Sequence, residues 1–169
     1  LATAPSTPGR MARVDAGQPF AVVVDYAHTP DAMEKVLRLL RQLHPAGRLI
    51  VVFGSAGERD KEKRPLQGAI AARLADICVI TSEDPRFEEA DAIITQIAAG
   101  AMKNGAVVND TLFCRTDRRE AIQLAFSLAR HGDCVLLAGK GHETSIIWGR
   151  EKVAWNEAEV ARELLLGVG

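Results

Sequence analysis

The sequence has no hydrophobic run near the roughly twenty residues that a membrane-spanning helix needs. Its first residues, Leu1 to Arg13, lack the apolar segment of a secretory signal peptide. Basic and acidic residues number 21 and 22, which leaves a formal charge of −1. A charge so close to zero creates no overall field that would attract nucleic acid or an anionic membrane. We therefore expect a cytoplasmic protein that binds neither of them.

Cysteine is scarce, with three residues at Cys78, Cys114 and Cys134. They lie in apolar stretches and show no C-x-x-C spacing, which predicts reduced thiols in the core rather than a disulfide or zinc framework. His28 and His142 also lack a histidine or carboxylate partner at the spacing typical of metal ligation. We expect no metal site in this chain.

Complete nucleotide-binding motifs are missing as well. Residues 54–64 do not match the phosphate loop G-x-x-x-x-G-K-[ST], and Gly139-Lys140-Gly141 lacks the third glycine and following helix of a dinucleotide fingerprint. The chain therefore has no complete machinery of its own for binding a nucleotide. Its first residue is Leu1 rather than Met, which fits a fragment of a longer protein.

What the sequence does contain is an alternation of short apolar runs and amphipathic segments. Residues 1–17, with several Pro and Gly, are expected to be an extended or partly disordered interdomain linker. Strands are predicted at 20–24, 49–53, 77–81 and 134–137, with one strand or two short ones in 106–114 and a hairpin over 144–154. Helices are predicted after Thr29, from Pro65, around 93–101, after Asp117 and after Asn156.

This alternation predicts one α/β domain over residues 18–169. Its sheet should be Rossmann-like and mostly parallel, with helices on both faces and a short antiparallel edge. Polar clusters follow four of the apolar runs, at 25–30, 54–64, 82–86 and 138–143. Because the carboxyl ends of parallel strands meet at one edge of a sheet, the four clusters should share one rim, where ligands bind in such folds.

The residue types in these clusters suit a small charged ligand, although each has a simpler interpretation. Arg59, Lys63 and Arg64 could hold phosphate or carboxylate groups, but a solvated charge run has the same composition. Asp25 could accept a hydrogen bond from a ribose hydroxyl, or it could compensate the positive end of a helix.

As a set, the clusters resemble the ordered signature of the C-terminal domain of MurE-type Mur ligases. The resemblance covers residues 9–169, and Ala12 stands where the domain-joining segment of the family usually has a glutamate. The motifs that carry it are Asp25-Tyr26-Ala27-His28-Thr29-Pro30, Arg59-Asp60-Lys61 with Lys63-Arg64-Pro65, Glu83-Asp84-Pro85-Arg86, and Gly139-Lys140-Gly141-His142-Glu143.

The resemblance implies a parent enzyme of three domains. An N-terminal domain would bind the UDP-sugar and a central domain would bind most of ATP and Mg²⁺, while this domain brings the incoming amino acid. The full ligase would form an acyl phosphate on UDP-N-acetylmuramoyl-L-alanyl-D-glutamate, and a diamino acid would attack it during peptidoglycan synthesis. The isolated chain is therefore expected to be catalytically inactive.

Site residues follow from the resemblance position by position. Asp25, Tyr26 and His28 would face the nucleotide, and no residue of the chain is assigned a catalytic or metal-binding role. The residues that would contact the diamino acid are Arg59, Glu83, Asp84, Pro85, Arg86, Gly139 and Glu143.

One departure from the family pattern concerns the choice of amino acid. Members that add meso-diaminopimelate usually read Asp-Asn-Pro-Arg, whereas this chain has Asp84 at the second position. The additional carboxylate would favour a distal ammonium, as in L-lysine or L-ornithine, over a distal carboxylate. Arg86 would favour the opposite. The amino acid stays open, with a slight preference for a basic diamino acid on grounds of charge.

Two other functions fit parts of the pattern. Folylpolyglutamate and cyanophycin synthetases share the domain and the amide-forming chemistry, but the G-K-G-H-E block and the Pro-Arg turn point away from them. A non-enzymatic module that binds a nucleotide or an amino acid is the alternative of a different class. Tight ATP binding by the isolated domain would favour that module.

Overall fold

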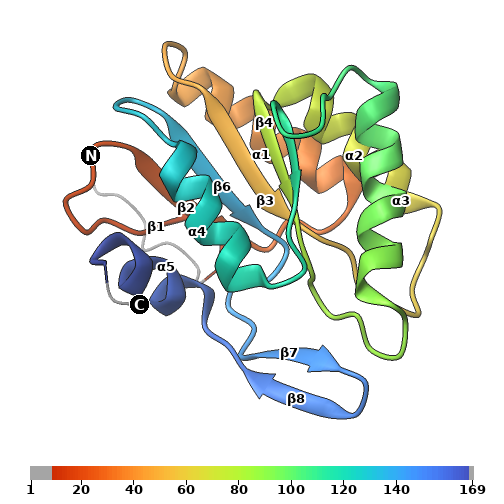
Figure 1. Cartoon of the computed structure of the whole chain (residues 1–169). Coiled ribbons are helices and arrows are strands. Elements are labelled where there is room, and N and C mark those ends of the chain that lie inside the picture. Colours follow the sequence, from red (N-terminus) through yellow and green to blue (C-terminus); the bar gives the residue numbers. More distant parts are fainter. Residues whose placement is uncertain (1–8, 168–169) are drawn as a thin grey trace.

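A computed structural model describes residues 9–167 (Figure 1). Six strands form one sheet in the order β1-β2-β6-β3-β4-β5. Five of them run parallel, namely β2 (Ala21–Asp25), β6 (Cys134–Ala138), β3 (Leu49–Phe53), β4 (Ile77–Ile80) and β5 (Leu112–Cys114). The edge strand β1 (Ala12–Arg13) is antiparallel to β2. The predicted fold class is confirmed.

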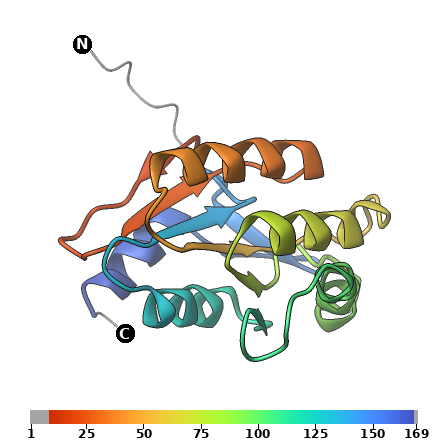
Figure 2. The same cartoon turned by 90° about the horizontal axis from the view of Figure 1, so that it is seen from above.

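Helices cover both faces of the sheet (Figure 2). One face packs against α1 (Pro30–Leu43), α2 (Lys63–Leu74) and α3 (Ala90–Lys103), and the other against α4 (Arg118–Leu128) and α5 (Glu157–Leu165). Because side chains alternate along a strand, Val23 joins the first core while Val22 and Val24 join the second. Strands buried on both faces explain the continuous apolar runs of the sequence.

Three helices begin at the capping residues that the sequence predicts. The side chain of Thr29 accepts a hydrogen bond from the backbone N–H of Ala32 at 3.2 Å. Asp117 and Asn156 accept equivalent bonds, each at 3.0 Å, from Glu120 and Glu159. These caps satisfy N–H groups that have no partner inside the helix.

Some local predictions were wrong. The apolar spacing of α2 puts Leu66, Ile70 and Leu74 on one buried face. Ile70 is buried as predicted, but Leu66 is 55% exposed, and Gln67 and Ala71 are buried as well. Val107 and Val108 lie outside β5 and are exposed. Cys78 and Cys134 are buried as predicted, whereas Cys114 is exposed. Each error comes from an apolar residue that the tertiary fold leaves at the surface.

The predicted linker and hairpin have more defined places than the sequence indicates. Ala12 and Arg13 pair with β2, and Val14, which is 2% exposed, belongs to the core. Residues 1–8 of the predicted linker lie outside the described residues. The hairpin forms a separate sheet of β7 (Ser145–Trp148) and β8 (Glu151–Ala154), beyond the carboxyl end of β6 (Figure 1). None of the described helices has the length and hydrophobicity that crossing a membrane requires.

Candidate functional site

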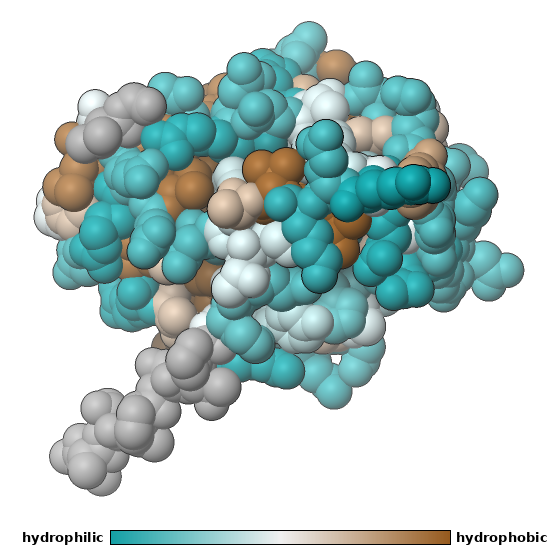
Figure 3. Space-filling view, turned by 90° about the horizontal axis from the view of Figure 1, so that it is seen from below, coloured by the Kyte–Doolittle hydropathy of each residue, from teal (hydrophilic) through white to brown (hydrophobic). Residues whose placement is uncertain are grey.

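The four polar clusters lie along one rim of the sheet, as predicted. They follow β2, β3, β4 and β6, which are parallel neighbours, so their carboxyl ends share one edge. The N–H of Gly139 donates to the carbonyl of Asp25 at 3.0 Å, which joins two of the clusters directly. Seen from below, this end of the molecule shows hydrophilic residues around smaller apolar areas (Figure 3).

Gly139 brings the loop after β6 close to the loop after β4. Its φ of +107° is in the region that favours glycine, and a Cβ added there would lie 3.2 Å from Oε1 of Glu83. The close approach leaves no room for a larger side chain without displacing Glu83. Gly139 therefore shapes the site through its backbone.

The carboxylate of Asp84 is already paired within the domain. The fully buried Nζ of Lys140 lies 2.9 Å from Oδ1 of Asp84, and the N–H of Ile147 donates to the same oxygen at 2.9 Å. Lys140 also lies 3.8 Å from Oε1 of Glu143. The sequence-based preference for a basic diamino acid assumed an uncompensated charge at Asp84, and this premise is wrong.

Glu83, next to Asp84, has no such partner. It is 5% exposed, and its carboxylate makes no hydrogen bond or ion pair within residues 9–167. Burial raises the pKa of Glu83 and the charge of Asp84 adds to the increase, whereas Arg118, Lys63 and Lys140 oppose it. With little exposure to water and no hydrogen bond from the described residues, the charged form of Glu83 is costly, and a cationic ligand or a proton would stabilise this position.

Two cations of the rim loops, Arg86 and Arg59, are also unpaired in the part of the chain that the structure describes. Arg86 is half-buried, and its buried Nε has no hydrogen-bond partner. Arg59 is exposed and pairs with no described acid. The residue before it, Glu58, accepts a hydrogen bond from the N–H of Phe87 at 3.1 Å, which keeps the loop of Arg59 beside the turn of Arg86.

Arg64, predicted as part of a cationic ligand-binding loop, has a structural role instead. Its guanidinium is fully buried, lies 2.9 Å from Oε1 of Glu88, and also donates to the carbonyl of Ala56 and to Oε1 of Gln96. The Arg64 side chain thus joins the loop after β3 to the segment after β4. Sequence composition could not separate it from the exposed Arg59.

Sequence reasoning also missed a second buried arginine behind the rim. Arg118 pairs with Glu157 at 2.6 Å and donates to the carbonyls of Ser82 and Ala138, at 2.9 and 3.0 Å. These bonds hold together the ends of β4 and β6, where Glu83 and Gly139 begin the site. Arg118 followed an expected helix cap, and nothing in its local sequence marked it as buried.

The cluster after β2 has two distinct parts. The carboxylate of Asp25 accepts hydrogen bonds from the N–H groups of Met11 and Ala27, each at 2.8 Å, so it holds the incoming chain to the end of β2. The ring of Tyr26 lies beside His28 and His142, with centroids 4.7 and 5.8 Å away. Burial raises the pKa of Tyr26, and the nearby carboxylates of the rim add to the increase.

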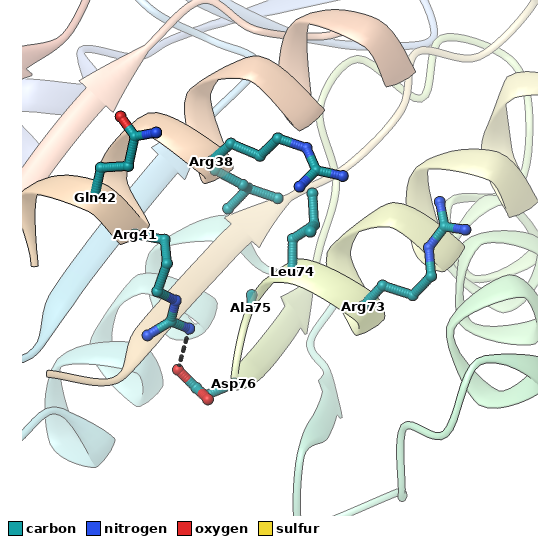
Figure 4. Close-up of a pocket in the computed structure, with 8 residues that line it drawn as sticks. Arg38, Arg41, Gln42, Arg73, Leu74, Ala75 and Asp76 are labelled. Carbon is teal, nitrogen blue, oxygen red and sulfur yellow. Dashed lines mark hydrogen bonds and ion pairs between the residues drawn. The ribbon is translucent and has the colours of Figure 1, made fainter. Parts of the chain in front are cut away.

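A separate hollow of about 440 Å³ lies elsewhere (Figure 4). It is at the C-terminal ends of α1 and α2, and Asp76 in its wall precedes β4, so it faces the edge of the sheet opposite the rim. Arg41 pairs there with Asp76 at 2.6 Å, and Arg38 with Glu34 at 3.0 Å. Arginines also compensate the negative ends of helices, which gives this pocket a structural explanation.

No group of three or more His, Cys, Asp or Glu within residues 9–167 could hold a metal ion. Separately, the rim brings together cations, carboxylates and aromatic rings. Its arrangement is suited to a small molecule with both ammonium and carboxylate groups.

The family model described as "Mur ligase, glutamate ligase domain" matches residues 9–141. The chain belongs to the Mur ligase family. It is 55% identical over its whole length to a UDP-N-acetylmuramyl-tripeptide synthetase of Roseiflexus sp. (strain RS-1), of which it covers 33%. Over 99% of the chain it is 48% identical to a UDP-N-acetylmuramoyl-L-alanyl-D-glutamate--2,6-diaminopimelate ligase of Syntrophomonas wolfei, again covering 33%.

Solved structures give the same picture. A UDP-N-acetylmuramoyl-L-alanyl-D-glutamate--2,6-diaminopimelate ligase matches 97% of this Mur ligase chain with a TM-score of 0.84 and 34% identity, and the match covers 32% of that ligase. A folylpolyglutamate synthase of Yersinia pestis matches 79% with a TM-score of 0.60 and 20% identity, covering 28% of that protein, which shows a shared fold alone. The resemblance to MurE-type ligases is confirmed, and the chain spans about a third of such enzymes.

Proposed function

We propose that this Mur ligase domain binds a diamino acid and presents its amine to the activated carboxylate of UDP-N-acetylmuramoyl-L-alanyl-D-glutamate. The names of relatives at 55% and 48% identity support this reaction. The observation in this chain that carries the proposal is Glu83, a buried carboxylate without a partner beside the paired Asp84 and Arg118. An ammonium group of the substrate would compensate its charge.

The charges of the rim favour meso-diaminopimelate as the amino acid. Arg59 and Arg86 are unpaired within residues 9–167 and can each bind a carboxylate. Glu83 can accept an ammonium, and so can Glu143, whose side chain is 36% exposed and has only a long contact of 3.8 Å with Lys140. Diaminopimelate has two carboxylates and two ammonium groups, whereas L-lysine and L-ornithine have one carboxylate and would leave an arginine unmatched. This proposal replaces the preference inferred from the charge of Asp84.

ATP and Mg²⁺ belong mainly to the rest of the ligase in this proposal. The chain has no phosphate loop, and Mg²⁺ in nucleotide sites is usually held by one or two carboxylates together with the phosphates. When bound, the two supply the activation of the substrate carboxylate. The contribution of this chain is a surface around Tyr26 and His28 that faces the nucleotide, while Asp25 positions that loop through its two backbone hydrogen bonds.

The test uses the full-length ligase with ATP, UDP-N-acetylmuramoyl-L-alanyl-D-glutamate and each of meso-diaminopimelate, L-lysine and L-ornithine. We expect an amide product detected by mass spectrometry, formed fastest with meso-diaminopimelate. Glu83→Gln should lower kcat/KM for the amino acid by about a hundredfold. Glu151→Gln, on the exposed strand β8, is the matched control and should change kcat/KM little.

Two results would count against this proposal. Absence of amide product with all three amino acids would contradict the assigned reaction. A kcat/KM higher for L-lysine than for meso-diaminopimelate would contradict the choice of amino acid and leave the reaction in place.

A further inference from the structure

The hairpin β7–β8 lies outside the main sheet but is attached to the turn that carries Arg86. The N–H of Arg86 donates to the carbonyl of Ile147 at 3.0 Å, and the N–H of Gly149 donates to the carbonyl of Arg86 at 2.7 Å. A third bond runs from the N–H of Ile147 to Oδ1 of Asp84 at 2.9 Å. These three hydrogen bonds couple the position of the hairpin to the conformation of the turn.

The same oxygen of Asp84 also binds Lys140. The Nζ of Lys140 is fully buried and lies 2.9 Å away, and the Asp84 side chain is 10% exposed. One carboxylate thus joins the loop after β6 to the turn after β4 and to the hairpin. Removing Asp84 leaves the buried Lys140 with only Glu143, at 3.8 Å, and removing Lys140 leaves Asp84 with only the N–H of Ile147. Losing a partner of a buried charge is more costly than losing a surface ion pair.

Arg86 depends on these attachments for its conformation. Its φ of +57° is unfavourable for a residue with a side chain, so the surroundings must hold it. On the other side of the turn, the N–H of Gly57 donates to the carbonyl of Asp84 at 2.7 Å. Held from both sides, Arg86 keeps a buried Nε without a hydrogen-bond partner among the described residues.

A guanidinium binds a carboxylate best through two parallel N–H donors, which requires an exact orientation of its plane. We propose that Asp84 and Lys140 form a clip that positions Arg86, through the β7–β8 hairpin, to bind the distal carboxylate of the diamino acid. This inference rests on the proposed function. Asp84 is then a positioning residue rather than a ligand of the amino acid, and Arg86 carries the choice between diamino acids.

The clip and a ligand role for Asp84 make opposite predictions. If Asp84 bound a distal ammonium directly, Lys140 would weaken that contact, so removing Asp84 and removing Lys140 would change substrate preference in opposite directions. In the clip, the two residues act as one unit, and removing either releases Arg86. The two substitutions should then change preference in the same direction, and the double substitution should add little.

The experiment measures kcat/KM of the full-length ligase for meso-diaminopimelate and for L-lysine, with the other substrates saturating. The variants are Asp84→Asn, Lys140→Met and the double variant, and Asp110→Asn at an exposed position is the matched control. The ratio of the two kcat/KM values does not depend on the fraction of enzyme that folds. It therefore separates a change in positioning from a loss of stability.

We expect the diaminopimelate-to-lysine ratio to fall about tenfold in each single variant. The double variant should stay within about twofold of either single variant, and Asp110→Asn should match the wild type. A ratio that changes in opposite directions in the single variants, or that stays at the wild-type value, would overturn the clip. A wild-type enzyme that ligates neither amino acid would overturn the proposed function and the clip together.

Discussion

The Nζ of Lys140 and Oδ1 of Asp84 are 2.9 Å apart, with the lysine side chain fully buried and that of aspartate 10% exposed. A second buried pair, Arg118 with Glu157, lies behind the same rim at 2.6 Å. These pairs leave Glu83 as the buried rim carboxylate without a partner in the described chain. The residue that stands out by charge in the sequence, Asp84, is therefore not the one whose charge is available to a substrate.

The charged form of Glu83 should lower the stability of the fold. Because burial raises the pKa of Glu83, the folded chain binds a proton at Glu83 more tightly than the unfolded chain does. Stability therefore falls as pH rises from the usual pKa of glutamate through the raised pKa. Glu83→Gln should therefore raise the Tm of the chain at pH 7.5, by about 2–4 °C per kcal/mol gained. Thermal unfolding followed by circular dichroism measures this gain, which should be smaller at pH 4. A Tm below that of the wild type at pH 7.5 would contradict it.

Glu88 should support the fold at neutral pH and lose this effect in acid. The hydrogen bond from Arg64, with a further one from the N–H of Glu58, lowers the pKa of Glu88 from 4.5 to about 2. Its contribution is complete above pH 4.5 and disappears as pH falls towards 2. Glu88→Gln should lower the free energy of unfolding in urea at pH 7 and flatten its pH dependence in this window. The control is Glu89→Gln, because the Glu89 side chain is exposed and makes no capping hydrogen bond to α3. This variant should behave as the wild type.

Position 9 should require glycine because the backbone at His142 lies against it, in addition to its positive φ. Both Gly9 and Gly17 have positive φ, of +76° and +87°. A Cβ on Gly9 would lie 2.3 Å from the backbone nitrogen of His142, whereas nothing lies within 4 Å of one on Gly17. Gly9→Ala should thus cost about 1–3 kcal/mol more than Gly17→Ala. Equal losses in urea unfolding would show that backbone conformation accounts for the whole effect.

The Arg118–Glu157 pair should be costly to break and much less costly to replace. Arg118→Met leaves Glu157 buried without its partner, for an expected loss of about 3–5 kcal/mol. Substituting both, as Arg118→Met with Glu157→Leu, removes the uncompensated charge and should recover part of this loss. A double-mutant cycle in urea measures the coupling between the two side chains. Additive losses would mean that the pair is not a unit.

Local features of the fold followed from the sequence because their physics is local. The caps at Thr29, Asp117 and Asn156 depend on an oxygen and an N–H three residues apart. By contrast, β1 has only two residues, which are too few to show the alternation of a strand. It forms because it pairs with β2, which lies later in the sequence. Leu66 was misassigned because apolar spacing alone does not show which face of α2 meets α3.

For the site, the sequence by itself determined which chemical groups reach the rim. Apolar runs that become parallel strands must end at one edge, so the turns with Asp25, Glu83 and Gly139 had to meet there. Only the tertiary structure decided which of these groups are already neutralised. Lys140 and Asp84 are 56 positions apart, and whether two charges pair depends on their distance and burial in the folded chain, which no local pattern encodes.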